Sequence, residues 1–173
     1  MRDPFLSSEQ DVGFRRARRR FLALASALCA PLPALAVSET RPLPPDFDPA
    51  RDPAQDLDTA LRIAKAARRS VLVEVGSDTC MPCRTLDRFF AANPELRKLR
   101  DVNYVWLKVN FSKENANEAF LRRFPPVADY PHFFVLDANG RLLHSQNTEA
   151  LEAAKDYDPA AMRAFLVKWA PDR

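Results

Sequence analysis

The sequence predicts an α/β fold in which a central mixed β-sheet of about four strands is flanked by helices. Three observations lead to this class. The apolar runs at residues 71–75 and 104–109 have the length of buried strands, and the first is rich in β-branched side chains. A third run, residues 132–136, is followed by the turn sequence Asp-Ala-Asn-Gly and a fourth strand at 141–145, which predicts an antiparallel pair at one sheet edge. Segments with helical periodicity separate the strands.

Two helices are predicted before and after the first strand from apolar residues spaced three to four positions apart. One covers residues 56–69 and leads into the strand. The other begins near Pro82, is interrupted at Asn93-Pro94 and continues over residues 95–100. The side chains expected to face the core are Leu57, Leu61, Ala64, Leu86, Phe89 and Phe90.

Two later helices are predicted from their capping residues. Ser112 is expected to cap a helix that presents Phe120 and Phe124 and ends at two consecutive prolines. Asp158 is expected to cap the last helix, which Pro159 opens. The core-facing side chains of this last helix are expected to be Met162, Phe165, Leu166 and Trp169.

Residues 1–36 have the features of an export signal. The basic run 15–20 precedes an apolar segment too short to span a bilayer, and Ala34-Leu35-Ala36 supplies the small residues that a signal peptidase reads. We therefore predict cleavage before Val37, a periplasmic mature protein and no stable membrane insertion after cleavage. Residues 18–22 also resemble a twin-arginine signal, and an ordinary arginine-rich secretory signal is the alternative.

The remaining chain is predicted to be one globular domain. Residues 37–53 carry several prolines and no apolar periodicity, which indicates an extended lead-in before a domain at 54–173. The six arginines and three acidic residues before Val37 account for the whole net charge of +3. The mature chain is therefore neutral, and its charge gives no support for nucleic-acid binding.

Two cysteines, Cys80 and Cys83, remain in this domain, since Cys29 lies in the export signal. They follow the first strand and stand at the start of a helix, where free backbone N–H groups and the helix dipole favour a thiolate at Cys80. The alternatives are a static disulfide and a zinc site. Zinc needs further ligands, and the domain offers only His132 and His144, on different strands. The pattern therefore favours dithiol redox chemistry without a metal.

The region around the cysteines resembles thioredoxin. The matching features are a buried strand, Glu74 six residues before Cys80, the Cys-x-Pro-Cys motif, Lys108-Val109-Asn110 at the end of the second strand and Tyr130-Pro131 before the third. The likeness covers residues 56–171 and is strongest around the cysteines. It implies a thioredoxin fold that lacks the first strand of that family.

Three departures from thioredoxin concern the surroundings of the cysteines. Gly76 and Thr79 stand where thioredoxin has tryptophans, and Glu74 replaces its buried aspartate. The loop 146–157 is also longer than its counterpart. Substrate preference is therefore not carried over from the family.

By this resemblance, the two cysteines form a redox-active disulfide, with Cys80 as the attacking thiolate and Cys83 as the resolving one. Met81 and Pro82 between them add neither charge nor a strong hydrogen-bond donor, which favours a reductase over an oxidase. The expected function is an exported reductase of protein disulfides that uses no cofactor and draws electrons from a membrane donor. The alternative is a non-catalytic thioredoxin-like binding protein or a copper metallochaperone that uses the same two cysteines.

Three further residues are candidates for the site by the same resemblance. Glu74 would move protons for the second cysteine, and the alternative is a structural ion pair with Lys108. Pro131 would be cis and lie beside the cysteines, where the backbone at Tyr130 and Pro131 would hold the substrate. The alternative for Pro131 is an ordinary loop proline.

Overall fold

The computed structural model describes residues 41–154 and 156–172, so the predicted export signal and its cleavage site lie outside the described residues. The helices are α1 (Pro53–Ala67), α2 (Met81–Ala92), α3 (Pro94–Asn103), α4 (Glu118–Leu121), the 3₁₀ helix η1 (Thr148–Leu151) and α5 (Pro159–Lys168). The strands are β1 (Ser70–Gly76), β2 (Tyr104–Asn110), β3 (His132–Leu136), β4 (Leu142–Asn147), β5 (Glu152–Ala153) and β6 (Asp156–Tyr157). None of the described helices has the length and apolarity needed to cross a membrane.

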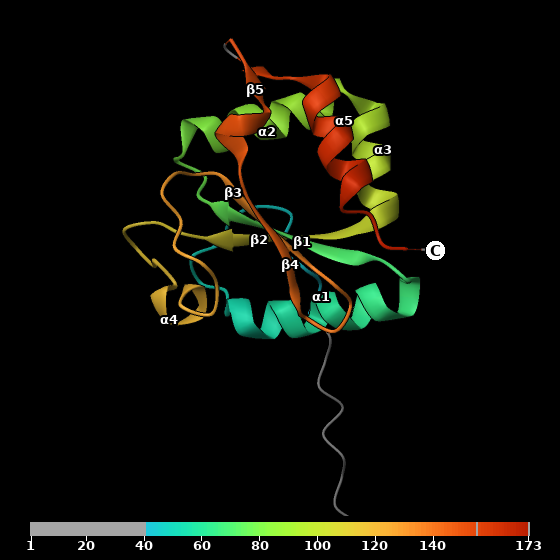
Figure 1. Ribbon diagram of the computed structural model, residues 1–173. Helices are drawn as coiled ribbons and strands as arrows, with labels where there is room; N and C mark the ends of the chain where they lie inside the picture. The colour runs from blue at the N-terminus through green and yellow to red at the C-terminus, as the bar shows by residue number, and fades with distance from the viewer. Residues whose placement is uncertain (1–40, 155, 173) are drawn as a thin grey trace, which may run out of the picture. The chain divides into compact units, whose positions relative to one another are not determined.

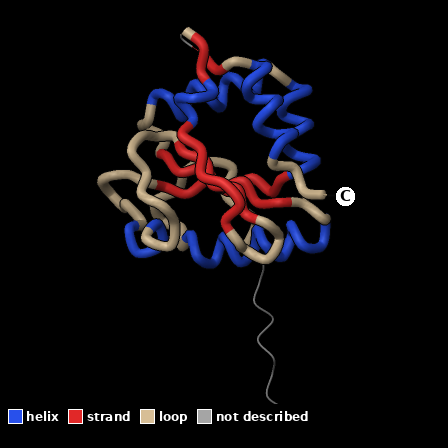
Figure 2. The backbone as a smooth tube through the Cα atoms, viewed as in Figure 1, coloured by secondary structure: helices blue, strands red, loops and turns tan. Residues whose placement is uncertain are grey.

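The main sheet has four strands in the order β2-β1-β3-β4. β1 runs parallel to β2 and antiparallel to β3, and β4 pairs antiparallel with β3. α1 and α4 lie on one side of the sheet, and α2, α3 and α5 lie on the other (Figure 1). Figure 2 shows the strands running between these two helical layers. The predicted α/β class with a four-stranded mixed sheet is therefore confirmed.

Every residue of β1 is buried, because helices cover both faces of this interior strand. Its three valines pack into the apolar cluster on the α1 side, while Leu72 joins the cluster formed with α2, α3 and α5. Side chains alternate along a strand, so Glu74 and Gly76 lie on the same face as Leu72. β1 therefore presents one carboxyl group and one glycine toward α2.

The helix boundaries follow capping chemistry. Asp158 accepts hydrogen bonds from the first turn of α5, as predicted. α1 begins at Pro53, earlier than predicted, because Asp52 caps it and the proline occupies the first turn. Asn93 separates α2 from α3, which confirms the predicted interruption.

The prediction that Ser112 caps a helix is wrong. α4 begins only at Glu118, and residues 111–117 form an irregular loop. The side chain of Asn110 donates hydrogen bonds to Ser112 Oγ at 3.1 Å and to the carbonyl of Asn115 at 2.7 Å. These bonds hold the loop in place of a helical turn, and Phe120 is still buried as predicted.

The segment before α1 is irregular, yet it packs on the domain. Phe47 is 3 % exposed, and the buried side chain of Arg51 forms an ion pair with Asp56 of α1. The prolines of this lead-in predict its irregular backbone but not the burial of these side chains. Phe47 reaches the candidate site described next.

Candidate active site

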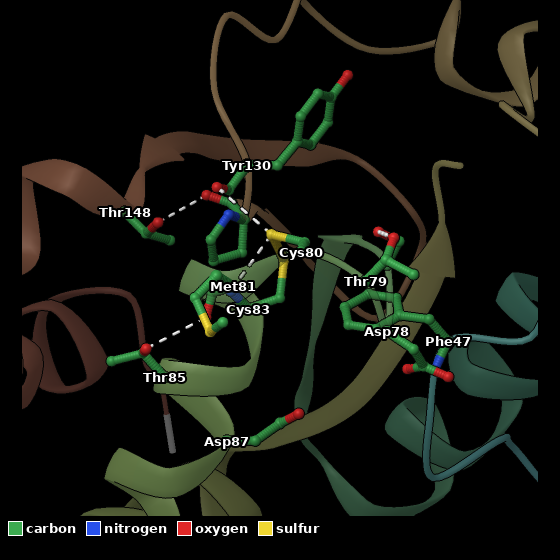
Figure 3. The surroundings of a disulfide bond; sticks show 12 residues. Phe47, Asp78, Thr79, Cys80, Met81, Cys83, Thr85, Asp87, Tyr130 and Thr148 are labelled. Carbon is green, nitrogen blue, oxygen red and sulfur yellow. Dashed lines mark hydrogen bonds between the residues drawn. A yellow bond between two sulfur atoms is a disulfide. The ribbon is translucent and has the colours of Figure 1, made fainter. Parts of the chain in front are cut away.

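Cys80 and Cys83 form a disulfide at the amino-terminal end of α2 (Figure 3). Cys80 is the N-cap residue, and its sulfur accepts a hydrogen bond of 3.3 Å from the backbone N–H of Cys83. A sulfur in this place faces the positive end of the helix dipole, which stabilises a thiolate once the disulfide is reduced. Cys80 is partly exposed, whereas Cys83 is 1 % exposed. Cys80 is therefore the sulfur that another molecule can reach.

Cys83 is buried against Gly76 of β1. A Cβ atom at position 76 would lie 2.5 Å from the sulfur of Cys83, so a glycine is required for this close approach. The ring of Phe47 reaches the same place, with its Cζ 3.0 Å from that Cβ position. Phe47 could not be recognised from the sequence, because a single aromatic residue in a proline-rich segment has no periodicity that would mark it as buried.

The Tyr130–Pro131 peptide bond is cis, as the resemblance implies, and it lies beside the disulfide (Figure 3). The carbonyl oxygen of Tyr130 is 3.8 Å from the sulfur of Cys80. Thr148 donates a hydrogen bond of 2.6 Å to the carbonyl of Pro131, and the Tyr157 hydroxyl donates to Thr148 at 3.4 Å. The long loop after β4 therefore helps to hold the cis-proline in place, a role that sequence reasoning did not assign.

An apolar groove of about 650 Å³ opens next to the cis-proline. Tyr130 forms one wall and stacks on Phe111, with ring centroids 4.4 Å apart. The other apolar lining residues come from α4 and the loop after it: Leu121, Phe124, Pro125, Pro126 and Val127. The groove and the disulfide thus share a neighbour in Tyr130.

Glu74 is fully buried, on the face of β1 that also carries Gly76. Within the described part of the chain, neither of its carboxylate oxygens has a hydrogen-bond partner. Burial raises the pKa of Glu74 from its ordinary value of 4.5 to about 8, against the opposing effect of the Lys108 charge. A carboxyl group with this pKa exchanges protons near neutral pH, which suits a general acid or base.

Lys108 stands directly opposite Glu74 in the parallel register of β1 and β2. Its ammonium group donates hydrogen bonds to both carboxylate oxygens of Asp87 on α2, at 2.7 and 2.9 Å. Lys108 is thus paired with Asp87 and not with Glu74, in contrast to the structural alternative from the sequence. It acts on Glu74 through its charge alone.

Trp106 and Arg100 complete the buried surroundings of Glu74. The indole N–H of Trp106 makes no hydrogen bond of normal geometry among the described residues, yet it lies close enough to the carboxyl to lower the pKa of Glu74. The guanidinium carbon of Arg100 lies 3.5 Å from the centroid of the Trp106 ring. Sequence reasoning missed both residues, because their nearness to Glu74 depends on strand register and on the packing of α3.

The two histidines stand apart from this chemistry. His132 shares a hydrogen bond of 2.8 Å with Ser145, and His144 one of 3.0 Å with Gln146. In residues 41–154 and 156–172, no group of three or more histidine, cysteine or acidic side chains is arranged to hold a metal ion.

The structure brings the sequence-predicted residues to one end of the sheet. Cys80 and the Tyr130–Pro131 bond meet at the start of α2, and Cys83 lies beneath them on Gly76. Glu74 lies deeper on the same strand face. The arrangement combines an accessible sulfur, a buried sulfur and a carboxyl group that titrates near neutral pH.

Comparisons with known proteins agree with this fold. A sequence profile described as thioredoxin-like matches residues 52–138. No curated protein sequence matches the chain. Among solved structures, a disulphide isomerase from Xylella fastidiosa Temecula1 has a TM-score of 0.61 at 21 % identity, covering 73 % of this chain and 96 % of that one. At this identity the likeness concerns the fold.

Two further solved structures are less similar. The oxidised C-terminal domain of DsbD from Neisseria meningitidis has a TM-score of 0.46 at 16 % identity, covering 55 % of this chain and 82 % of that one. A thioredoxin from Fasciola hepatica has a TM-score of 0.42 at 18 % identity, covering 67 % of this chain and 93 % of that one.

Proposed function

Because the chain belongs to the thioredoxin-like family, we propose that it is a thiol-disulfide oxidoreductase that reduces disulfides of other proteins in the periplasm. The observation that carries the proposal is the unequal exposure of two linked sulfurs at a helix start: Cys80 is accessible beside a cis-proline, and Cys83 is buried. A two-step exchange needs one thiolate that attacks the substrate disulfide and a second thiolate that attacks only the mixed disulfide formed by the first.

The exchange begins with the reduced protein. The Cys80 thiolate attacks one sulfur of a substrate disulfide, and the other substrate sulfur leaves as a thiolate. Cys83 then loses its proton and attacks the Cys80 sulfur, which forms the Cys80–Cys83 disulfide and releases the second substrate sulfur as a thiolate. Two electrons pass from the protein to the substrate, and a dithiol of a membrane reductase is the proposed source that returns them.

Glu74 is the proposed acceptor of the Cys83 proton. The two residues lie toward the same face of β1, because Cys83 contacts Gly76 and Gly76 is two positions from Glu74. A carboxyl group with a pKa of about 8 gains and loses a proton near neutral pH at little cost. Burial thereby gives Glu74 the near-neutral pKa that proton transfer in the second step needs.

The substrate is proposed to bind as an extended segment along the backbone at Tyr130 and Pro131. The nearness of the Tyr130 carbonyl to Cys80 supports this position, since a peptide paired there would hold its own disulfide close to the attacking sulfur. The adjacent groove would take an apolar side chain of the same segment.

Trapping of mixed disulfides tests the mechanism. Cys83→Ser should accumulate covalent complexes with substrate proteins, because the mixed disulfide at Cys80 forms but its resolving thiol is absent. Cys80→Ser, the matched control, should trap few. Capture by Cys83 instead of Cys80 on non-reducing gels would reverse the assigned roles, and failure of the wild-type protein to reduce insulin would overturn the proposed activity.

Export is proposed from the features of residues 1–36. Fractionation of the native host should recover a protein that begins at Val37 in the periplasm. Changing Arg18 and Arg19 together to lysine should block export if the twin-arginine route is used, whereas continued export would indicate the ordinary secretory route. A full-length cytoplasmic protein would contradict the proposed location.

A further inference from the structure

The lead-in before α1 is fastened across the end of the sheet that carries the disulfide. We call residues 42–52 the strap. Its Arg51 guanidinium donates to the carbonyl of Pro42 at 2.9 Å, and Asn115 donates to the carbonyl of Pro49 at 2.9 Å. The strap is thus tied both to itself and to the loop after β2.

A third tie joins the strap to the loop between β1 and α2, which ends at Cys80. The backbone N–H of Phe47 donates a hydrogen bond of 3.3 Å to Asp78 Oδ1, two residues before Cys80 (Figure 3). Asp78 itself is exposed. The position of Phe47 is therefore set by a contact with the loop before Cys80 and not only by packing in the apolar core.

The ring of Phe47 and the buried sulfur of the disulfide border the same position next to Gly76. The Cys83 sulfur and the Phe47 ring both border the space above Gly76, since a Cβ there would meet them at 2.5 and 3.0 Å. The same ring lies 4.9 Å from the ammonium nitrogen of Lys108. Phe47 is 3 % exposed, so its outer edge is covered as well.

We propose that Phe47 is a positioning residue of the redox site, and that the strap keeps Cys83 inaccessible to reagents and partners when the disulfide is reduced. This inference rests on the proposed dithiol function. Because Gly76 has no side chain, the resolving sulfur and an aromatic ring from another part of the chain both crowd the position that a Cβ would take. Exchange with outside disulfides is thereby confined to Cys80, since a disulfide must reach a thiolate before that thiolate can attack it.

Alkylation of the reduced full chain tests this role. Under native conditions iodoacetamide should modify Cys80 well before Cys83, as read at each cysteine by peptide mass mapping. Phe47→Ala should raise the rate at Cys83 by about tenfold or more, because the thiol becomes accessible. Phe47→Leu should largely restore protection, because an apolar side chain again fills the space.

Leu136→Ala is the matched control for lost core packing. Leu136 is fully buried on β3, but it faces the α1 side and pairs with Val71, at the end of β1 away from the cysteines. Leu136→Ala should destabilise the protein about as much as Phe47→Ala does, because both are large-to-small changes in the core. It should leave the alkylation rate of Cys83 unchanged. An equal rise in the alkylation rate of Cys83 in both variants would mean that Phe47 is only an ordinary core residue.

Asp78→Ala provides a second route if Phe47→Ala does not fold. It removes the acceptor that holds the strap without opening the core, and it should raise the Cys83 rate several-fold, whereas Asp46→Ala at an exposed strap position should not. Unchanged Cys83 rates in Asp78→Ala and in every folded Phe47 variant would overturn the inference. Failure of the wild-type protein to reduce insulin would instead overturn the proposed function, whatever the alkylation rates.

Discussion

Glu74→Gln should remove a pH dependence of stability that is set by burial. The pKa of this carboxyl is about 8 in the fold against an ordinary 4.5, a difference of about 3.5 units. At 1.36 kcal/mol per unit this corresponds to about 5 kcal/mol. Because the folded-state pKa is raised, the stabilising effect of proton binding is fully present below pH 4.5 and is lost as the pH rises toward 8. Relative to Glu74→Gln, the wild type should lose about 3 kcal/mol by pH 7 and about 5 kcal/mol above pH 8.

Urea unfolding of the oxidised protein at pH 4.5, 7 and 9 measures this effect. The disulfide stays intact in both states, so neither Cys80 nor Cys83 titrates. The quantity of interest is the difference in unfolding free energy between the wild type and Glu74→Gln at each pH, since other titrating groups cancel in it. Glu149→Gln, at an exposed position on η1, should give a curve parallel to that of the wild type.

Parallel curves for the wild type and Glu74→Gln would refute the reasoning. They would mean that the carboxylate is as stable inside the fold as in the unfolded chain. The buried carboxyl would then have a proton-independent role, and the proposed transfer from Cys83 to Glu74 would lose its physical basis. Glu74→Leu provides a further check, because replacing a poorly compensated buried carboxylate by an apolar side chain should stabilise the protein by about 1–4 kcal/mol while slowing turnover.

Further predictions concern the disulfide and its neighbours. Gly76→Ala should favour the reduced form, because the new Cβ would lie 2.5 Å from a Cys83 sulfur that can turn away only when it is a free thiol. An overpacking cost of about 1–3 kcal/mol would raise the reduction potential by roughly 20–60 mV, and an unchanged potential after glutathione equilibration would show that the strand yields. The wild-type potential should lie nearer to roughly −270 mV than to roughly −120 mV, and a value above about −180 mV would contradict a reductase. Thr148→Val should cost about 1–3 kcal/mol of unfolding free energy, since it leaves the Pro131 carbonyl without its donor. The control is Thr85→Val, at an exposed hydroxyl of α2, and equal losses in both variants would count against the anchoring role of Thr148.

The sequence was sufficient for those elements whose signals are local. The strand at β1, the break at Asn93 and the cap at Asp158 each depend on a few neighbouring residues, and all three appear in the structure. Ser112 does not cap a helix, because its hydroxyl is engaged by the side chain of Asn110. A residue with good capping chemistry does not start a helix when a nearby side chain holds the loop in another conformation.

The parts of the site that the sequence did not reveal are those assembled over long distances. Phe47 reaches the surroundings of Cys83, and Thr148 reaches the Pro131 carbonyl, from segments that lie far from the cysteines along the chain. Trp106 reaches Glu74 through the register of β1 with β2. None of these contacts leaves a periodic pattern, whereas the two cysteines were recognisable from a compact motif and Pro131 from its place directly before a strand.

Because β1 is an interior strand, the site is complete only after strands that are synthesised later have paired with it. A ribosome that has just completed β2 has already made both cysteines, but it has not yet made β3, the cis-proline or Thr148. The sheet depends on sequence-distant pairings, which raise its contact order and delay its completion. Until β3 pairs with β1, Cys80 and Cys83 have neither a substrate-binding edge beside them nor a buried position for the resolving thiol. The capacity for controlled exchange is therefore acquired late, as a property of the finished domain and not of its motif.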